Sequence, residues 1–163
     1  MALEQISINS PEGCIAPGLH REVIQSIGTT ERQLLPEESG SLILMDAADQ
    51  ITVRLPTPVA GMQFEFLTTI TVTSSDTHKI ITKTIATEFL LGGVGDFNTT
   101  QANGGDSFNA VTGDSFVAFT SNGSTTGGLL GQHLKFTAIS ATRWVVSGHQ
   151  VSTGTSATAF ATS

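Results

Sequence analysis

The chain has 163 residues, a length that suits one domain with a core of its own. Its 7 Lys and Arg residues are outnumbered by 14 Asp and Glu residues, which gives a formal charge of −7. Because no cluster of Lys and Arg supplies a basic face, this composition argues against nucleic-acid binding through phosphates and against attraction to anionic membranes.

The sequence gives no sign of a disulfide, a cofactor or a membrane segment. Cys14 is the single cysteine, and no Cys/His cluster predicts a zinc site. Residues 1–8 lack the basic and apolar regions of a secretory signal, and no run of about 18 apolar residues predicts a membrane span. We therefore expect a protein that is made and kept soluble, with no metal or cofactor required.

Residues 1–30 are predicted to form an extended N-terminal arm with local turns. Residues 20–27 could make only a short helix, ending at Gly28. Three alternating apolar residues near the start, Leu3, Ile6 and Ile8, could add a strand to the edge of a partner's sheet, which is a common mode of peptide recognition. The alternative is that the arm is simply the frayed end of the domain.

Residues 31–163 are predicted to form a single all-β domain, either an antiparallel β-sandwich or a jelly-roll-like barrel. Short runs of alternating or β-branched residues are separated by turn residues throughout this part. The predicted strands are Gln33–Leu35, Ser41–Asp46, Gln50–Leu55, Gln63–Thr73, Lys79–Ile85, Ser115–Ser121, Leu134–Ile139, Thr142–Ser147 and a weak one near Thr158–Ala161.

The clearest pattern surrounds a Pro-Thr-Pro-x-x-Gly corner formed by Pro56, Pro58 and Gly61. Strict alternation before and after this corner is typical of half-buried strands. The prolines lack the amide hydrogen that a central strand needs, so they mark where one strand ends and the chain turns. Phe64 and Phe66 after the corner, with Trp144 on a late strand, are the predicted core aromatic residues. The alternative for Trp144 is an exposed platform for a sugar ring.

Two glycine-rich stretches, 92–114 and 122–131, are predicted to be loops. The first resembles a calcium-binding nonapeptide at Gly92–Asp96, but its aspartate comes one position early and no second copy follows in register. Long loops on a rigid sheet are common recognition sites, so both stretches are candidates for binding.

Enzymatic motifs are not found. The four histidines never occur at zinc-ligand spacing, and the glycine runs lack the lysine of a phosphate-binding loop. Ser75, Asp76 and His78 are triad residue types, but their adjacency in a turn does not make a catalytic arrangement. We predict that the protein is not an enzyme and has no catalytic residues.

Several segments resemble, in order, the β-domain of decoration, cement and head-fibre proteins on tailed-bacteriophage capsids. They are Leu35–Gly40, Leu42–Asp46, Ile51–Pro56, Pro58–Phe64 and Trp144–Gly148, and the resemblance covers roughly residues 31–150. The chain departs from the pattern at Arg143, where an Asn-rich turn is more usual, and in its glycine-rich stretch.

The resemblance implies a virion structural protein on the capsid surface, synthesised in the host cytoplasm and commonly a homotrimer, that contacts the major capsid protein and stabilises the shell. The arm residues Leu3, Ile6 and Ile8 would then contact the capsid. The alternative is a receptor- or glycan-binding adhesion module of a phage fibre, with the loops 92–114 and 122–131 as its recognition surface.

Overall fold

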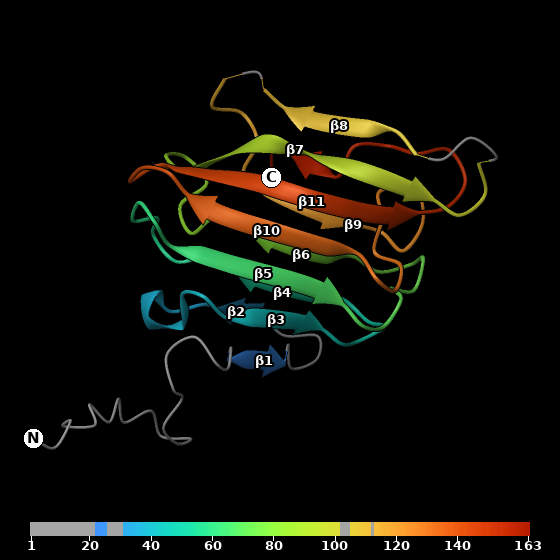
Figure 1. Ribbon diagram of the computed structural model, residues 1–163, viewed down its shortest axis with the longest axis horizontal. Helices are drawn as coiled ribbons and strands as arrows, with labels where there is room; N and C mark the ends of the chain where they lie inside the picture. Colours follow the sequence, from blue (N-terminus) through green and yellow to red (C-terminus); the bar gives the residue numbers. More distant parts are fainter. Residues whose placement is uncertain (1–21, 26–30, 102–104, 112) are drawn as a thin grey trace, which may run out of the picture.

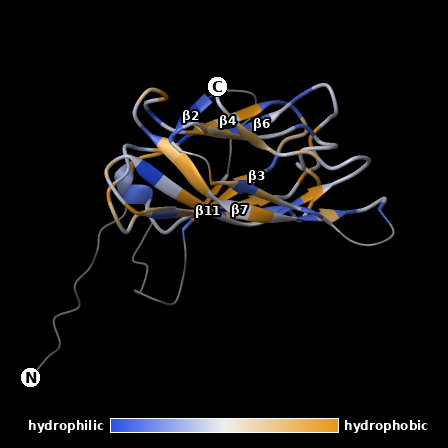
Figure 2. Ribbon diagram, turned by 90° about the horizontal axis from the view of Figure 1, so that it is seen from above, coloured by the Kyte–Doolittle hydropathy of each residue, from blue (hydrophilic) through white to orange (hydrophobic). Residues whose placement is uncertain are grey.

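The chain folds into two β-sheets packed face to face (Figures 1 and 2). The computed structural model describes residues 22–25, 31–101, 105–111 and 113–163. The strands of these residues are β1 (Val23–Gln25), β2 (Glu31–Gln33), β3 (Leu42–Met45), β4 (Ile51–Arg54), β5 (Gln63–Thr68), β6 (His78–Ile81), β7 (Phe89–Asn98), β8 (Ser107–Ala110), β9 (Ala118–Ser121), β10 (His133–Ala138), β11 (Arg143–Ser152) and β12 (Phe160–Ala161). A short 3-10 helix, η1 (Pro36–Glu38), precedes β3.

The all-β sandwich predicted from the alternating pattern is confirmed. Over the described ranges the larger sheet has the order β1-β3-β5-β10-β11-β7-β8, and the smaller has the order β12-β9-β6-β4-β2. The sheets are mixed rather than purely antiparallel, because β3 is parallel to β1 and β5, β7 to β11, and β4 to β2 and β6. Alternation identifies the buried face of a strand but not the direction of its neighbour.

The proline corner carries the chain from one sheet to the other. β4 belongs to the smaller sheet and β5 to the larger one. Pro56 and Pro58 are buried and have no N–H that would need a partner there. Gly61 has a φ of +97°, which favours glycine, and its N–H donates to the carbonyl oxygen of Ala138 at 2.9 Å. The corner is therefore a crossover between the two layers.

The predicted glycine-rich excursion over residues 92–114 is corrected by the structure. Much of this segment lies in the larger sheet, where β7 pairs with β11 and β8 pairs with β7. At Gly92, which has a φ of +102°, an added Cβ would lie 2.3 Å from the carbonyl oxygen of Val146. Glycine is required there because the neighbouring strand lies too close for a side chain. Composition alone does not distinguish such a glycine from a glycine in a loop.

The core is aromatic and lies between the sheets. Phe64, Phe66 and Trp144 are buried, as are their neighbours from both layers. The Trp144 ring lies 5.9 Å from the Phe64 ring, and Phe66 contacts Phe136 edge to face at 5.2 Å. Tilted and edge-to-face contacts of this kind add to the free energy gained from burial.

The interior becomes polar at the end of the sandwich where β5, β7 and β11 finish. The buried polar side chains at this end are Thr68, His78, Asp96, Asn98, Ser121, Gln132, Gln150 and Ser152. They come from both sheets, whereas the other buried polar side chains of the described residues, Ser41, Thr82 and Glu88, lie at the opposite end. We call the group at the ends of β5, β7 and β11 the polar interior.

Only the last part of the predicted arm falls within the described residues. Val23–Gln25 forms the edge strand β1, with Ile24 buried, and the Glu22 carbonyl accepts a hydrogen bond from the N–H of Leu42 at 2.9 Å. The short helix considered for residues 20–27 is therefore not formed at residues 23–25. Leu3, Ile6 and Ile8 lie outside the described residues.

We predict that Trp144→Ala lowers the free energy of unfolding by roughly 3–5 kcal/mol, since it leaves a large cavity beside Phe64. Urea unfolding followed by circular dichroism measures the loss. Val145→Ala, on the same strand but only half-buried, is the control and should cost clearly less. A Trp144→Ala variant as stable as the parent would show that the ring does not hold the core together.

We also predict that His78 makes stability depend on pH between about 7 and 5. Burial lowers the pKa of His78, and this effect exceeds the opposing effect of the Ala47 carbonyl that contacts its ring. The unfolded chain therefore binds the proton more readily than the folded one. The stabilisation is complete above the unfolded pKa of about 6.5 and is lost as the pH falls below it.

The measurement is the urea midpoint as a function of pH. His78→Gln keeps a hydrogen-bond donor but cannot titrate, so its midpoint should fall less between these pH values. His149→Gln, at a partly exposed position, should behave like the parent. Equal slopes for the parent and His78→Gln would contradict the assignment.

Candidate protein-binding surface

One end of the sandwich is built from loops 34–41, 55–62, 82–88, 111–117 and 139–142. They join β2 to β3, β4 to β5, β6 to β7, β8 to β9 and β10 to β11, with residue 112 outside the described part. The strand pairings bring all of them to the same end, on the left in Figure 1. We call this surface the five-loop end.

Each loop of the five-loop end exposes one large aliphatic side chain. The exposed fractions are 54% for Leu35, 58% for Val59, 48% for Ile85, 73% for Val111 and 50% for Ile139. Over the described ranges the other exposed large apolar residues are Val23, Ile70, Phe97 and Leu130. Single exposed apolar residues are ordinary, but several on adjoining loops make this end the candidate surface for contact with another protein.

Backbone hydrogen bonds connect the loops of this end to one another and to the strands. The bonds are Leu34 N–H to Arg54 O at 2.9 Å, Leu55 N–H to Ile81 O at 2.8 Å, Gly61 N–H to Ala138 O at 2.9 Å, Thr82 N–H to Val117 O at 3.0 Å and Phe89 N–H to Thr142 O at 2.9 Å. We call these loops and the strands to which they are hydrogen-bonded the hydrogen-bonded frame. The exposed aliphatic side chains therefore lie on loops whose backbone is ordered by hydrogen bonds.

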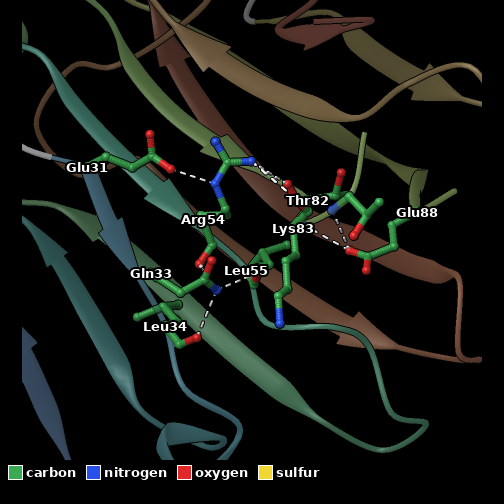
Figure 3. Close-up of polar contacts among 9 residues, drawn as sticks. Glu31, Gln33, Leu34, Arg54, Leu55, Thr82, Lys83 and Glu88 are labelled. Atoms are coloured by element: carbon green, nitrogen blue, oxygen red, sulfur yellow. Dashed lines mark hydrogen bonds and ion pairs between the residues drawn. The ribbon is translucent and has the colours of Figure 1, made fainter. Parts of the chain in front are cut away.

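Arg54, the last residue of β4, connects three segments of this frame (Figure 3). Its Nε donates to Glu31 Oε1 on β2 at 2.5 Å, and its Nη1 lies 3.2 Å from the carbonyl oxygen of Thr82 and 3.4 Å from that of Lys83. The guanidinium hydrogen bond and charge hold the pKa of Glu31 below its usual value. The loop after β6 is thereby held against the edge of the smaller sheet.

Two further side chains support the same frame (Figure 3). Gln33 Nε2 lies within 3.0 to 3.2 Å of the carbonyl oxygens of Leu34, Arg54 and Leu55. Buried Glu88 accepts the N–H groups of Lys83 and Thr84 through Oε2 at 3.0 and 3.2 Å. These contacts satisfy backbone groups that the crossover loops would otherwise leave unpaired.

The arginines of the five-loop end are neutralised locally. Arg32 pairs with Glu38 at 2.6 Å, Arg54 with Glu31 at 2.5 Å and Arg143 with Asp114 at 3.0 Å. The loops at the opposite end carry the acidic residues Asp46, Asp49, Asp76 and Asp106. The surface that exposes the aliphatic side chains is therefore closer to electrical neutrality than the rest of this acidic protein.

The sequence-predicted residues fall around this surface. Pro56, Pro58 and Gly61 form one of its loops, and Phe64 and Trp144 begin the buried layer below it. Phe66 lies deeper in the core. Sequence reasoning missed the five aliphatic side chains, although each is an isolated apolar residue among the turn residues of its loop.

Of the two stretches considered for adhesion, 92–114 is only in part a loop. Its described part includes strands β7 and β8. In the loop 122–131, Asn122 Oδ1 accepts the N–H groups of Ser124 and Thr126, both at 3.0 Å. Other groups of this loop bond outside it, since the Leu130 N–H donates to Thr71 Oγ1 at 3.0 Å and the Thr153 N–H donates to the Ser124 carbonyl at 3.1 Å.

Across residues 22–25, 31–101, 105–111 and 113–163, no group of three or more His, Cys, Asp or Glu side chains is arranged to hold a metal ion. The same part of the chain has no helix with the length and hydrophobicity of a membrane span.

Comparison of the chain with protein-family models, with curated proteins and with solved structures found no match in any of the three.

We predict that Arg54→Met destabilises the protein by about 1–2 kcal/mol, because it removes a charged donor from Glu31 and from two backbone carbonyls at a partly exposed site. Urea unfolding measures the loss, and limited proteolysis should show faster cleavage in 82–88. Arg143→Met removes an exposed ion pair and is the control, with a smaller expected effect. Equal effects of the two substitutions would contradict a special role for Arg54.

Proposed function

We propose that the protein is a structural protein of a tailed-phage virion, which binds the outer surface of the capsid as an oligomer and stabilises the shell. The phage assignment is supported by the resemblance of residues 31–150 to capsid decoration and head-fibre domains. Three of the resembling segments, Leu35–Gly40, Ile51–Pro56 and Pro58–Phe64, contribute residues to the five-loop end. The contact surface is supported by the geometry of that end.

The observation that carries the proposal is the set of five exposed aliphatic side chains on hydrogen-bonded loops at one end of the sandwich. Covering them with a partner protein removes apolar surface from water, which is the main driving force of protein association. The locally paired arginines keep repulsion low at this end. The partner proposed for this surface is the major capsid protein.

A protein of this kind acts by binding and needs no catalytic group. If it binds only the assembled shell, it shifts the equilibrium toward that state by mass action. Several copies joined in one oligomer, with a trimer as the expected form, would bind more tightly than one copy because the second and third contacts form at high effective concentration.

We predict that the double substitution Val59→Asp and Ile139→Asp weakens capsid binding at least about tenfold, since it places two charges in an apolar contact. The matched control is Ile70→Asp with Leu130→Asp, which changes two exposed apolar residues at the opposite end. Binding is measured by co-sedimentation with capsids of the encoding virus that lack the protein.

Thermal unfolding of both variants establishes that they are folded. Undiminished binding by the Val59/Ile139 variant, or equal loss in the control, would contradict the five-loop end as the contact surface. The copy number in purified virus particles separates the two candidate functions. Copies comparable in number to the capsid subunits indicate decoration, whereas a few copies per particle indicate an adhesion module.

A further inference from the structure

Two buried oxygen atoms in the polar interior lack hydrogen-bond donors. Asp96 on β7 and Gln150 on β11 are directly opposite each other in the parallel strand pair, and both side chains are buried. Within the described part of the chain, Asp96 Oδ1 and Gln150 Oε1 have no hydrogen-bond partner. Buried polar atoms of this kind are rare in folded proteins and indicate a missing interaction.

The remaining polar atoms of these two side chains are already occupied. Asp96 Oδ2 accepts the hydroxyl groups of Ser152 and Ser156 at 2.8 and 2.5 Å. Gln150 Nε2 donates to the carbonyl oxygen of Ala157 at 3.3 Å, which directs its Oε1 away from that carbonyl. The surrounding residues therefore donate hydrogen bonds to Asp96 Oδ2 and none to Asp96 Oδ1.

The charge of Asp96 is also uncompensated. The ion pairs of the described residues involve Glu31, Glu38, Glu65 and Asp114, and none involves Asp96. A buried ionised carboxylate without a positive partner is strongly unfavourable. A positively charged species next to Asp96 Oδ1 would remove this cost.

A bare cation needs less room beside these oxygens than a water molecule does. Both unpartnered oxygens are buried away from solvent. Oxygen ligands lie 2.3–2.6 Å from Ca²⁺, whereas a water oxygen lies about 2.7–2.8 Å from its hydrogen-bonding partner. The hydroxyls of Ser152 and Ser156 donate to Asp96 Oδ2 and accept from Asn98 Nδ2 at 3.1 and 2.7 Å, so each keeps one lone pair that could complete the oxygen ligands.

We infer that Asp96 and Gln150 bind a hard cation of the size of Ca²⁺ or Na⁺, with Ser152 and Ser156 beside it. The set contains one carboxylate and otherwise neutral oxygens, the ligand chemistry of such ions. The cation joins β7, β11 and the loop before β12, since Ser156 and Ala157 lie in that loop. It stabilises the end of the sandwich opposite the five-loop end.

The test is thermal unfolding of the full chain in buffers of equal ionic strength that contain CaCl₂, NaCl or choline chloride, after treatment with a chelator. We expect Ca²⁺ or Na⁺ to raise Tm above the value in choline, by roughly 5–10 °C at a hundredfold excess over Kd. The salt that does so identifies the ion. Calorimetric titration of the active salt into protein in choline buffer should show saturable binding.

Asp96→Asn and Gln150→Leu should each abolish both the dependence of Tm on the cation and the calorimetric binding signal. Glu37→Gln removes an equal charge from an exposed position and should keep both. Identical Tm values of the parent in all three salts would overturn the inference. So would an Asp96→Asn variant more stable than the parent in every salt, because a direct hydrogen bond from residue 96 to Gln150 would then suffice.

Discussion

The structure depends on the crossover at residues 55–62, where the chain passes from β4 in the smaller sheet to β5 in the larger one. Such a crossover must keep its backbone groups paired while it passes over the end of a dry core. Two buried prolines reduce the number of N–H groups to satisfy, and the N–H groups of Leu55 and Gly61 reach carbonyls of β6 and β10. Arg54 binds the loop after β6 and the strand β2 to the same frame. The two layers and the five-loop end therefore share one set of contacts.

The two ends of the sandwich have opposite characters. At the five-loop end the core below the loops is aromatic, and the loops expose aliphatic side chains. At the other end the interior is polar, and the loops are rich in Ser, Thr, Gly and Asp. The difference between the two surfaces is one of degree, because Ile70 and Leu130 are also exposed at the polar end. The five-loop end has the larger number of exposed aliphatic side chains, which is why the proposed function places the contact there.

Alternation in the sequence was enough to predict the sandwich and most of the strands that follow the corner. It could not identify β7, because Gly92, Gly93 and Gly95 resemble a loop until the pairing of this strand with β11 and β8 is known. It could not give strand direction either, since a period of two residues is the same in parallel and antiparallel pairs. The aliphatic residues at positions 35, 59, 85, 111 and 139 are far apart in the chain. Only the topology shows that these residues lie at the same end of the sandwich.

The size of the apolar surface favours an oligomer as the binding unit. Burying one aliphatic side chain completely contributes about 1.5–3 kcal/mol, and side chains that are already half-buried gain about half of that. Five of them supply roughly 4–7 kcal/mol, while association costs an estimated 4–15 kcal/mol in lost freedom. The hydrogen-bonded frame lowers that cost because its loops are already ordered, but it does not remove it. One copy would thus bind weakly. Copies linked in one oligomer lose most of their translational and rotational freedom only once, when the first copy binds. Each additional five-loop end then adds nearly all of its free energy of burial to the binding free energy.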